Sequence, residues 1–178
     1  MTKVYMVTLP RRDTYREGNA IFRAMRAYDI KRWLVGAETG ANGYRHWQIR
    51  LKWRGTFEEL KAIMGAQAHI EEASDTWQYE AKEGAYWSST DRRENRGQRF
   101  GKWRYSQERI WEALQATNDR EVVVWYDERG CCGKSWFTRS LWERGLAYFT
   151  VADSSAKTLV QDIASEFIRN GWRPVVCI

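Results

Sequence analysis

Two neighbouring strand-forming runs limit the possible folds of this chain more than any other part of the sequence. Residues 32–38 and 45–53 are rich in β-branched and aromatic side chains. Between them, Gly40 and the pair Asn42-Gly43 supply the positive-φ positions that a tight connection needs. The two runs therefore predict a β-hairpin, and with it a sheet in the first half of the chain.

The two faces of this hairpin differ in chemistry. Successive side chains of a strand point to opposite faces, so His46 and Gln48 share one face while Trp47 and Ile49 share the other. Glu38 ends the first strand, and cross-strand Cβ atoms lie about 4.5–5.5 Å apart, so its carboxylate can join the polar face. A carboxylate, an imidazole and an amide oxygen suit Mg²⁺ or Mn²⁺ better than zinc. The alternative is a solvated sheet face that binds no metal.

The other segments of residues 1–88 alternate between strand and helix patterns. Asn19, Thr56 and Asp75 are each placed to cap a helix. The resulting order, βαββαβαβ, predicts an α+β fold in which helices cover an antiparallel sheet. Beside the hairpin, the expected strands are 3–10, 68–72 and 85–87, and the expected helices are 19–28, 56–64 and one that carries Tyr79 and Lys82.

The helix expected after Asp75 carries a second group of reactive side chains. Tyr79, Lys82 and Glu83 stand at i, i+3 and i+4, which places them on one side of a helix. Tyrosine is a weak nucleophile unless its phenolate is stabilised, and a neighbouring ammonium and a metal ion can both do this. The alternative is an ordinary amphipathic helix with Trp77 and Tyr79 partly buried.

The balance of charge and aromatic residues points to nucleic acid. The net charge is +6, and 29 Lys and Arg are interleaved with 11 Trp and 9 Tyr. A single-strand binder needs cations for phosphates and rings for bases, although simple solubility also explains the charge. The candidate DNA contacts are Arg11, Arg12, Arg16, Arg45, Arg50, Lys52, Trp53 and Trp87.

The cysteines and the hydropathy pattern indicate a cellular setting. Cys131, Cys132 and Cys177 follow neither a zinc spacing nor a secreted disulfide framework, which favours a reducing compartment. No apolar run approaches the roughly 20 residues that a membrane span needs, and the N-terminus does not resemble a signal peptide. We therefore expect a soluble intracellular protein with no membrane partner.

The pattern changes after residue 88. Residues 88–104 are polar and strongly basic, which predicts a linker, and residues 105–117 have helical periodicity. Then follow strand, loop, helix, strand, helix and strand, an order typical of a parallel α/β unit. The expected strands are 122–126, 147–151 and 174–178, and the expected helices are 136–144 and 155–170.

The loop at residues 130–135 contains a possible phosphate-binding sequence. Gly133-Lys134-Ser135 at a strand–loop–helix junction would surround a phosphate with backbone N–H groups, add the charge of Lys134, and offer the Ser135 hydroxyl to Mg²⁺. The full GxxxxGK[ST] pattern needs a glycine where this chain has Glu128. The pattern is therefore weak by itself, and a glycine turn before a helix explains it equally well.

Taken in order, these motifs resemble the three signatures of the replication initiators (Rep proteins) of small circular single-stranded DNA viruses, members of the HUH endonuclease superfamily. The signatures here are YMVTLP in the first strand, Glu38 followed by His46-Trp47-Gln48, and YEAKEG from Tyr79. Within this group the chain is most similar to the smacovirus Reps. Gln48 stands where the superfamily name records a second histidine, which should weaken metal affinity.

The resemblance implies a domain layout and a reaction. It implies an HUH endonuclease domain at 1–88, a basic linker and connecting helix at 89–118, and an incomplete superfamily 3 helicase-like domain at 119–178. In such proteins the tyrosine, here Tyr79, attacks a phosphodiester of a single-stranded origin stem-loop and forms a 5′-phosphotyrosine link. Lys82 would assist, Mg²⁺ or Mn²⁺ would sit on Glu38, His46 and Gln48, and Glu83 could add a metal contact.

Further expectations concern the second domain and the cell. A helicase of this type needs an acid just after a strand such as 174–178, where the sequence ends, so the chain reads as a truncated product or a fragment. ATP would be a cofactor only if that domain were complete, and no ATP-driven unwinding is expected. The resemblance also implies the host nucleus and a possible homo-oligomer. The alternatives are a non-catalytic nucleic-acid-binding module and, less favoured, a P-loop NTPase with an N-terminal adaptor.

Overall fold

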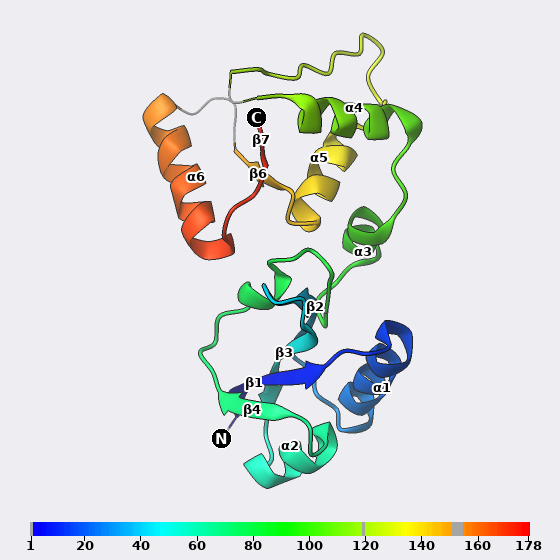
Figure 1. Ribbon diagram of the computed structural model, residues 1–178, viewed down its shortest axis with the longest axis vertical. Coiled ribbons are helices and arrows are strands. Elements are labelled where there is room, and N and C mark those ends of the chain that lie inside the picture. Colours follow the sequence, from blue (N-terminus) through cyan, green and yellow to red (C-terminus); the bar gives the residue numbers. More distant parts are fainter. Residues whose placement is uncertain (1, 119, 151–154) are drawn as a thin grey trace. The chain divides into compact units, whose positions relative to one another are not determined.

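The computed structural model describes residues 2–118, 120–150 and 155–178. The chain forms two compact units, Met1–Asp91 and Arg92–Ile178 (Figure 1). Among the described residues, no helix is long and apolar enough to cross a membrane.

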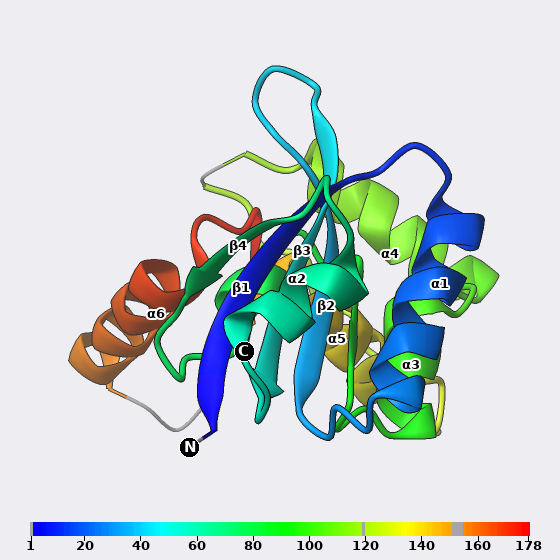
Figure 2. The same cartoon turned by 90° about the horizontal axis from the view of Figure 1, so that it is seen from below.

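The first unit is built on a five-stranded antiparallel sheet with the order β4-β1-β3-β2-β5. The strands β1, β3 and β2 run side by side in Figure 2, and the β2–β3 hairpin loop projects at the top of that view. The α+β class and the antiparallel sheet are as predicted, and each strand lies within one residue of its predicted bounds. The strands are β1 (Lys3–Pro10), β2 (Trp33–Thr39), β3 (Arg45–Trp53), β4 (His69–Glu72) and β5 (Tyr86–Ser88).

Two α-helices lie among the described residues of this unit. Helix α2 (Phe57–Met64) begins at Thr56 as predicted, with a complete capping box between Thr56 and Glu59. Helix α1 (Thr14–Ala27) begins earlier than predicted, and Asn19 lies inside it. The Asp13 carboxylate is the actual cap, because it accepts hydrogen bonds from the backbone N–H groups at positions 15 and 16.

The core lies between the sheet and these helices. Trp47 and Ile49 on β3 are at most 1% exposed and pack with Met25 of α1 and Leu60 of α2. Burying one large aliphatic side chain of this kind stabilises a fold by about 1.5–3 kcal/mol. In Figure 1, α2 lies below the strands of this unit, and the segment drawn in green between β4 and β5 lies above them. The predicted apolar face of the hairpin is therefore the core face, which leaves the opposite face for the polar side chains.

The second unit contains four helices and a two-stranded parallel sheet among its described residues. The elements are α3 (Arg93–Phe100), α4 (Tyr105–Ala116), α5 (Lys134–Glu143), β6 (Ala147–Phe149), α6 (Ala156–Asn170) and β7 (Val175–Cys177). The parallel pairing of β6 with β7 agrees with the predicted α/β pattern. The expected end of β6 at Val151 lies outside the described residues.

The segment predicted as a linker instead forms α3. Its charged composition suggested solvent exposure, but Arg99 donates two hydrogen bonds to the Glu143 carboxylate of α5, and both side chains are buried. Both bonds reach the Oε2 oxygen of Glu143, and this buried charge-assisted pair holds the two helices together. Arg99 thus serves packing within the unit, whereas Arg92, Arg93 and Arg96 are exposed.

The strand predicted at 122–126 does not form. Val122, Val124 and Tyr126 are more than three-quarters exposed, whereas Trp125 packs edge-on against Phe137. Only one side of this extended segment touches the core, and no strand in the described part of the chain pairs with it. The apolar composition correctly indicated partial burial, but it does not show whether another strand is available to pair with the segment.

Candidate active site

Glu38 and His46 face each other across the β2–β3 hairpin, as the sequence predicts. They are register partners, and Glu38 Oε2 lies 3.6 Å from His46 Nε2. His46 Nδ1 lies 3.3 Å from the Tyr44 carbonyl oxygen, which can only accept, so Nδ1 carries the proton in the neutral ring. The lone pair of Nε2 then faces a carboxylate oxygen. Two facing acceptors favour a cation between them.

Gln48 lies on the same face, two residues further along β3. It is buried, and its Oε1 accepts a hydrogen bond of 2.9 Å from Thr8 Oγ1. An amide oxygen has two lone pairs, so this bond leaves one for a second partner. Gln48 therefore lies beside His46, and the hydrogen bond from Thr8 of β1 fixes the position of its amide.

Tyr79 lies on a single 3₁₀ turn, η1 (Tyr79–Ala81), and not on the predicted α-helix. Arg50 explains the difference, because its Nη1 donates to the Ser74 carbonyl oxygen and its Nε donates to Glu80 Oε1 at 2.7 Å. These tertiary bonds hold the segment in a bent path across the sheet. The backbone groups of residues 73–78 are drawn away from a regular helix, which also moves Tyr79, Lys82 and Glu83 off one helical face.

Gly36 allows this turn to pack closely on β2. A Cβ atom at Gly36 would lie 2.2 Å from the carbonyl oxygen of Glu80. Any side chain there would collide with backbone, so the absence of one allows η1 to rest directly on β2. Gly36 pairs with Gln48 in the register, and therefore the turn settles next to the polar face of the hairpin.

Lys82 connects the turn to the carboxylate. Its Nζ lies 2.8 Å from Glu38 Oε2 and 3.8 Å from the centroid of the Tyr79 ring. Burial lowers the pKa of Lys82, but hydrogen bonding and charge interactions with Glu38 and Tyr79 outweigh this effect and raise the pKa above its ordinary value. Lys82 is therefore an ammonium at neutral pH, placed between a buried carboxylate and an exposed phenol.

One oxygen of this carboxylate is unsatisfied. Glu38 is 2% exposed, and its Oε1 has no hydrogen-bond partner in the part of the chain that the structure describes. Leaving a buried acceptor unpaired costs about 1–3 kcal/mol, and more for a charged group. With His46 Nε2 and the Gln48 amide, this oxygen makes a donor set that fits a hard divalent cation. No three His, Cys, Asp or Glu side chains among the described residues gather as metal ligands, so a cation here needs the amide, water or phosphate as well.

Glu83 and Arg11 support the end of β2. Glu83 Oε2 accepts a hydrogen bond of 2.9 Å from the Thr39 N–H, so one of its oxygens is engaged away from the proposed metal ligands. Arg11 donates to the Glu38 carbonyl oxygen at 3.1 Å and to Thr39 Oγ1. Burial is the main reason why the pKa of Arg11 is lowered. Both residues fix the backbone that carries Glu38.

The other candidate DNA contacts divide into two groups. Arg50 is buried against Glu80, and Trp87 packs against Trp47 and Phe22, so these side chains hold the fold together. Lys52 forms an ion pair with Asp75 and Trp53 donates to the Thr56 carbonyl oxygen, while the remaining arginines are exposed or half-buried. The exposed or half-buried candidates are Arg11, Arg12, Arg16, Arg45 and Lys52.

Sequence analysis missed Gly36 and Glu80. Glu80 stands between Tyr79 and Lys82 and is 1% exposed. Its partner Arg50 lies on the same face of β3 as His46 and Gln48. When another segment covers that face, a buried arginine there needs a buried acidic partner. That argument was available from the strand pattern alone.

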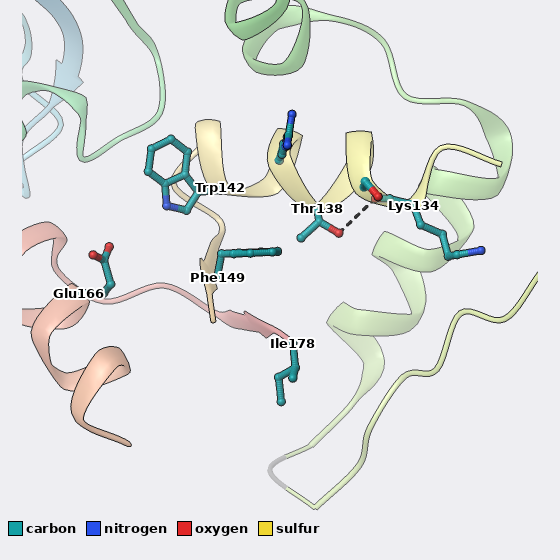
Figure 3. Close-up of a pocket in the computed structure, with 8 residues that line it drawn as sticks. Lys134, Thr138, Trp142, Phe149, Glu166 and Ile178 are labelled. Carbon is teal, nitrogen blue, oxygen red and sulfur yellow. Dashed lines mark hydrogen bonds between the residues drawn. The ribbon is translucent and has the colours of Figure 1, made fainter. Parts of the chain in front are cut away.

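In the second unit, the predicted phosphate-binding residues stand at the start of α5. Gly133 has φ +90° and caps the helix, and Lys134 and Ser135 form its first turn. A cavity of about 620 Å³ borders both residues. Figure 3 shows the Lys134 side chain extending away from Phe149, and its Nζ lies 3.3 Å from Cys132 Sγ. The strand expected before this loop is absent, so the arrangement is a helix N-terminus without the strand–loop–helix junction.

Neither a comparison with models of known protein families nor a search of curated proteins finds a match for this chain. The geometry around Glu38, His46 and Tyr79 is therefore the basis for assigning a function.

Proposed function

We propose that this protein nicks and joins single-stranded DNA through a covalent link to Tyr79, as an initiator of rolling-circle replication. The observation that carries the proposal is the position of Lys82, whose ammonium contacts both the Glu38 carboxylate and the ring of Tyr79. An exposed phenol beside a fixed positive charge is what a tyrosine nucleophile requires. The motif order described above adds the substrate class, an origin stem-loop.

The reaction follows from these groups. Tyr79 Oη attacks the scissile phosphorus, its proton passes to solvent, and the bond from phosphorus to the 3′ oxygen breaks. The DNA keeps a 5′-phosphotyrosine link, and the leaving 3′ oxygen takes up a proton to become a free hydroxyl. Lys82 stabilises the phenolate as it forms. Run in reverse, the same steps join two ends.

Glu38, His46 and Gln48 would hold Mg²⁺ or Mn²⁺ beside this tyrosine. When bound, such an ion would polarise the phosphate and offset the negative charge that develops on it. The unpaired Glu38 Oε1 and the facing Nε2 of His46 support this assignment. Because only one imidazole and one carboxylate contribute, we expect weak binding.

A non-catalytic nucleic-acid-binding module is the alternative. It is favoured by Tyr44 and Tyr79, which flank the site and are both about half exposed, since such rings can stack on bases. A binding module, however, has no use for a lysine held between a buried carboxylate and a phenol. Formation of a covalent bond separates the two proposals.

The decisive experiment incubates the protein with an end-labelled single-stranded stem-loop oligonucleotide and Mn²⁺. We expect a labelled protein–DNA adduct that survives denaturing electrophoresis. Tyr79→Phe should bind the oligonucleotide normally and give no adduct. An equal adduct yield from Tyr79→Phe would disprove the role of Tyr79, and the absence of any adduct from the wild-type chain with cognate DNA would leave the binding module as the function.

The proposal extends to the second unit in a limited way. Lys134 and Ser135 at the start of α5 would give weak nucleotide binding without ATP-driven unwinding. Location in the nucleus of an infected cell and self-association belong to the same proposal. ATP turnover that depends on Lys134 would contradict it.

A further inference from the structure

A second polar feature of the first unit lies at the opposite end of the β2–β3 hairpin. A cavity of about 220 Å³ is bordered by the end of α1, the start of β2 and the end of β3. The backbone N–H of Lys52 donates to the Arg32 carbonyl oxygen, which ties the two strands together there. Glu38 pairs with His46, and Trp33 pairs with Leu51, five residues along each strand. At a rise of about 3.3 Å per residue, the cavity lies roughly 17 Å from the candidate active site.

The lining of this cavity is strongly basic. Four cations border it, together with Asp29, which forms an ion pair with Lys31. Lys52 forms its ion pair with Asp75. Within the described residues, Arg32 and Arg54 form no ion pair, so two guanidinium groups remain available to an anion. The four cations are Lys31, Arg32, Lys52 and Arg54.

Aromatic rings accompany these charges. The guanidinium carbon of Arg32 lies 4.6 Å from the centroid of the Trp77 ring, which holds its planar group in one orientation. Tyr28, which is 53% exposed, and Trp53 border the same cavity. Cations for a phosphate and rings for a base are the two components of a single-strand binding surface.

The size of the cavity limits what it can hold. At about 220 Å³ it is smaller than the roughly 300–1,000 Å³ typical of small-molecule sites. A single nucleotide unit of a longer strand suits it better than a separate cofactor. Two of the lining side chains also contact the segment that carries the nucleophile. Lys52 forms an ion pair with Asp75 and Arg32 stacks on Trp77, and both partners lie shortly before Tyr79.

We infer that this cavity is an accessory subsite for single-stranded nucleic acid, in which Arg32 and Arg54 hold a backbone phosphate and Tyr28 or Trp53 stacks on a base. The inference rests on the proposed function in one respect, that the bound strand is the one presented to Tyr79. The subsite holds the nucleic acid roughly 17 Å from the candidate active site, a distance of about five β-strand residues. It contributes affinity without taking part in the chemistry.

The test measures binding of a fluorescent single-stranded oligonucleotide to the full chain as a function of salt. The Arg32→Ala/Arg54→Ala variant is compared with Arg23→Ala/Lys61→Ala, which removes the same charge from exposed positions on α1 and α2. For single strands, log K falls with log salt by about 0.7 per neutralised phosphate, so loss of the one phosphate held by Arg32 and Arg54 should reduce the slope by about 0.7. We expect this reduction, with at least a tenfold loss of affinity, only in the first variant. Equal behaviour of the two variants would overturn the subsite.

A second variant guards against misfolding. Arg54→Glu alone reverses a charge on an exposed side chain that makes no hydrogen bond or ion pair in the described part of the chain. It should retain the thermal unfolding midpoint of the wild type and still lose affinity, and unchanged affinity would again refute the subsite.

The outcome separates the subsite from the nicking proposal. All binding is measured in the Tyr79→Phe background, where no adduct can form, and adduct yield is measured separately with Tyr79 present. If Arg32→Ala/Arg54→Ala loses affinity while the Tyr79 chain forms no adduct, the subsite stands and the nicking proposal fails. If an adduct forms and affinity is unaffected, nicking stands and the subsite fails.

Discussion

Glu80 Oε1 lies 2.7 Å from Arg50 Nε, in a buried ion pair directly beneath the turn that carries Tyr79. Arg50 also binds the Ser74 carbonyl oxygen, so a single guanidinium holds the segment at two points. The pair fixes where the tyrosine backbone crosses the sheet.

Glu80→Ala should destabilise the first unit strongly. Removing one partner of a buried ion pair costs about 3–5 kcal/mol, because the other charge stays buried without a partner. The free energy of unfolding from urea titration checks this. Asp75→Ala, which breaks the exposed pair with Lys52, is the matched control and should cost much less. An equal effect of the two substitutions would show that the Arg50–Glu80 pair does not anchor the segment.

Gly36→Ala should separate the Tyr79 turn from the sheet. The added Cβ would meet the Glu80 carbonyl oxygen at 2.2 Å, so backbone must move, at a cost of about 1–3 kcal/mol for this kind of overpacking. Adduct yield should fall more than DNA affinity does. Gly97→Ala is the control, because nothing lies within 4 Å of its added Cβ. If Gly36→Ala gives the same adduct yield as the wild type, close packing of η1 on β2 is not needed for the reaction.

Glu38→Gln should lower the pKa of Lys82. Hydrogen bonding and charge from Glu38 help to raise that pKa against the effect of burial, and the substitution removes the charge. The expected change can be followed by NMR titration of the Lys82 side chain. A pKa that does not move would show that Glu38 and Lys82 are not coupled in solution.

The same interaction makes stability depend on alkaline pH. A lysine whose pKa is raised on folding contributes stability that is fully present below its ordinary value of 10.5 and is lost as the pH rises through the folded value. Unfolding free energies measured from pH 9 upward should therefore fall less steeply for Lys82→Met than for the wild type. Parallel curves would contradict this prediction.

Mn²⁺ should stabilise the wild-type chain and not His46→Ala. A ligand that binds only the folded state adds about 2.7 kcal/mol at 100 times its Kd. His46 supplies the only nitrogen ligand of the proposed set, so its loss should abolish most of this gain, seen as the shift in thermal midpoint on adding Mn²⁺. His69→Ala, at an exposed histidine on β4, is the control and should respond to Mn²⁺ like the wild type. Equal Mn²⁺ stabilisation of His46→Ala would place the ion elsewhere.

The sequence predicted the first unit well where local signals decide the structure. The hairpin turn, the alternating face of β3 and the Thr56 capping box are all set by residues near each other in the chain. The pairing of Glu38 with His46 followed from the same local register. These features needed no knowledge of distant contacts.

The failures arose where distant residues decide. The turn at Tyr79 replaced a helix because Arg50, nearly thirty residues away, binds the segment from beneath. Helix α3 formed in a charged stretch because Arg99 finds Glu143. The apolar run at 122–126 has strand composition, but a strand also needs a neighbour, and composition does not supply one. The first two errors reflect tertiary partners that no local pattern names, and the third reflects a pairing strand that the described residues do not supply.

Trp47 separates His46 from Gln48, and its indole is part of the core while its two neighbours lie on the opposite face of the sheet. A slip of β3 by one residue would turn the indole to the polar face and the two site residues into the core. No molecule can therefore have a correctly arranged site on a misregistered sheet. The fraction of molecules that react would serve as a direct count of correctly folded protein, so a preparation could be graded by titrating its active sites.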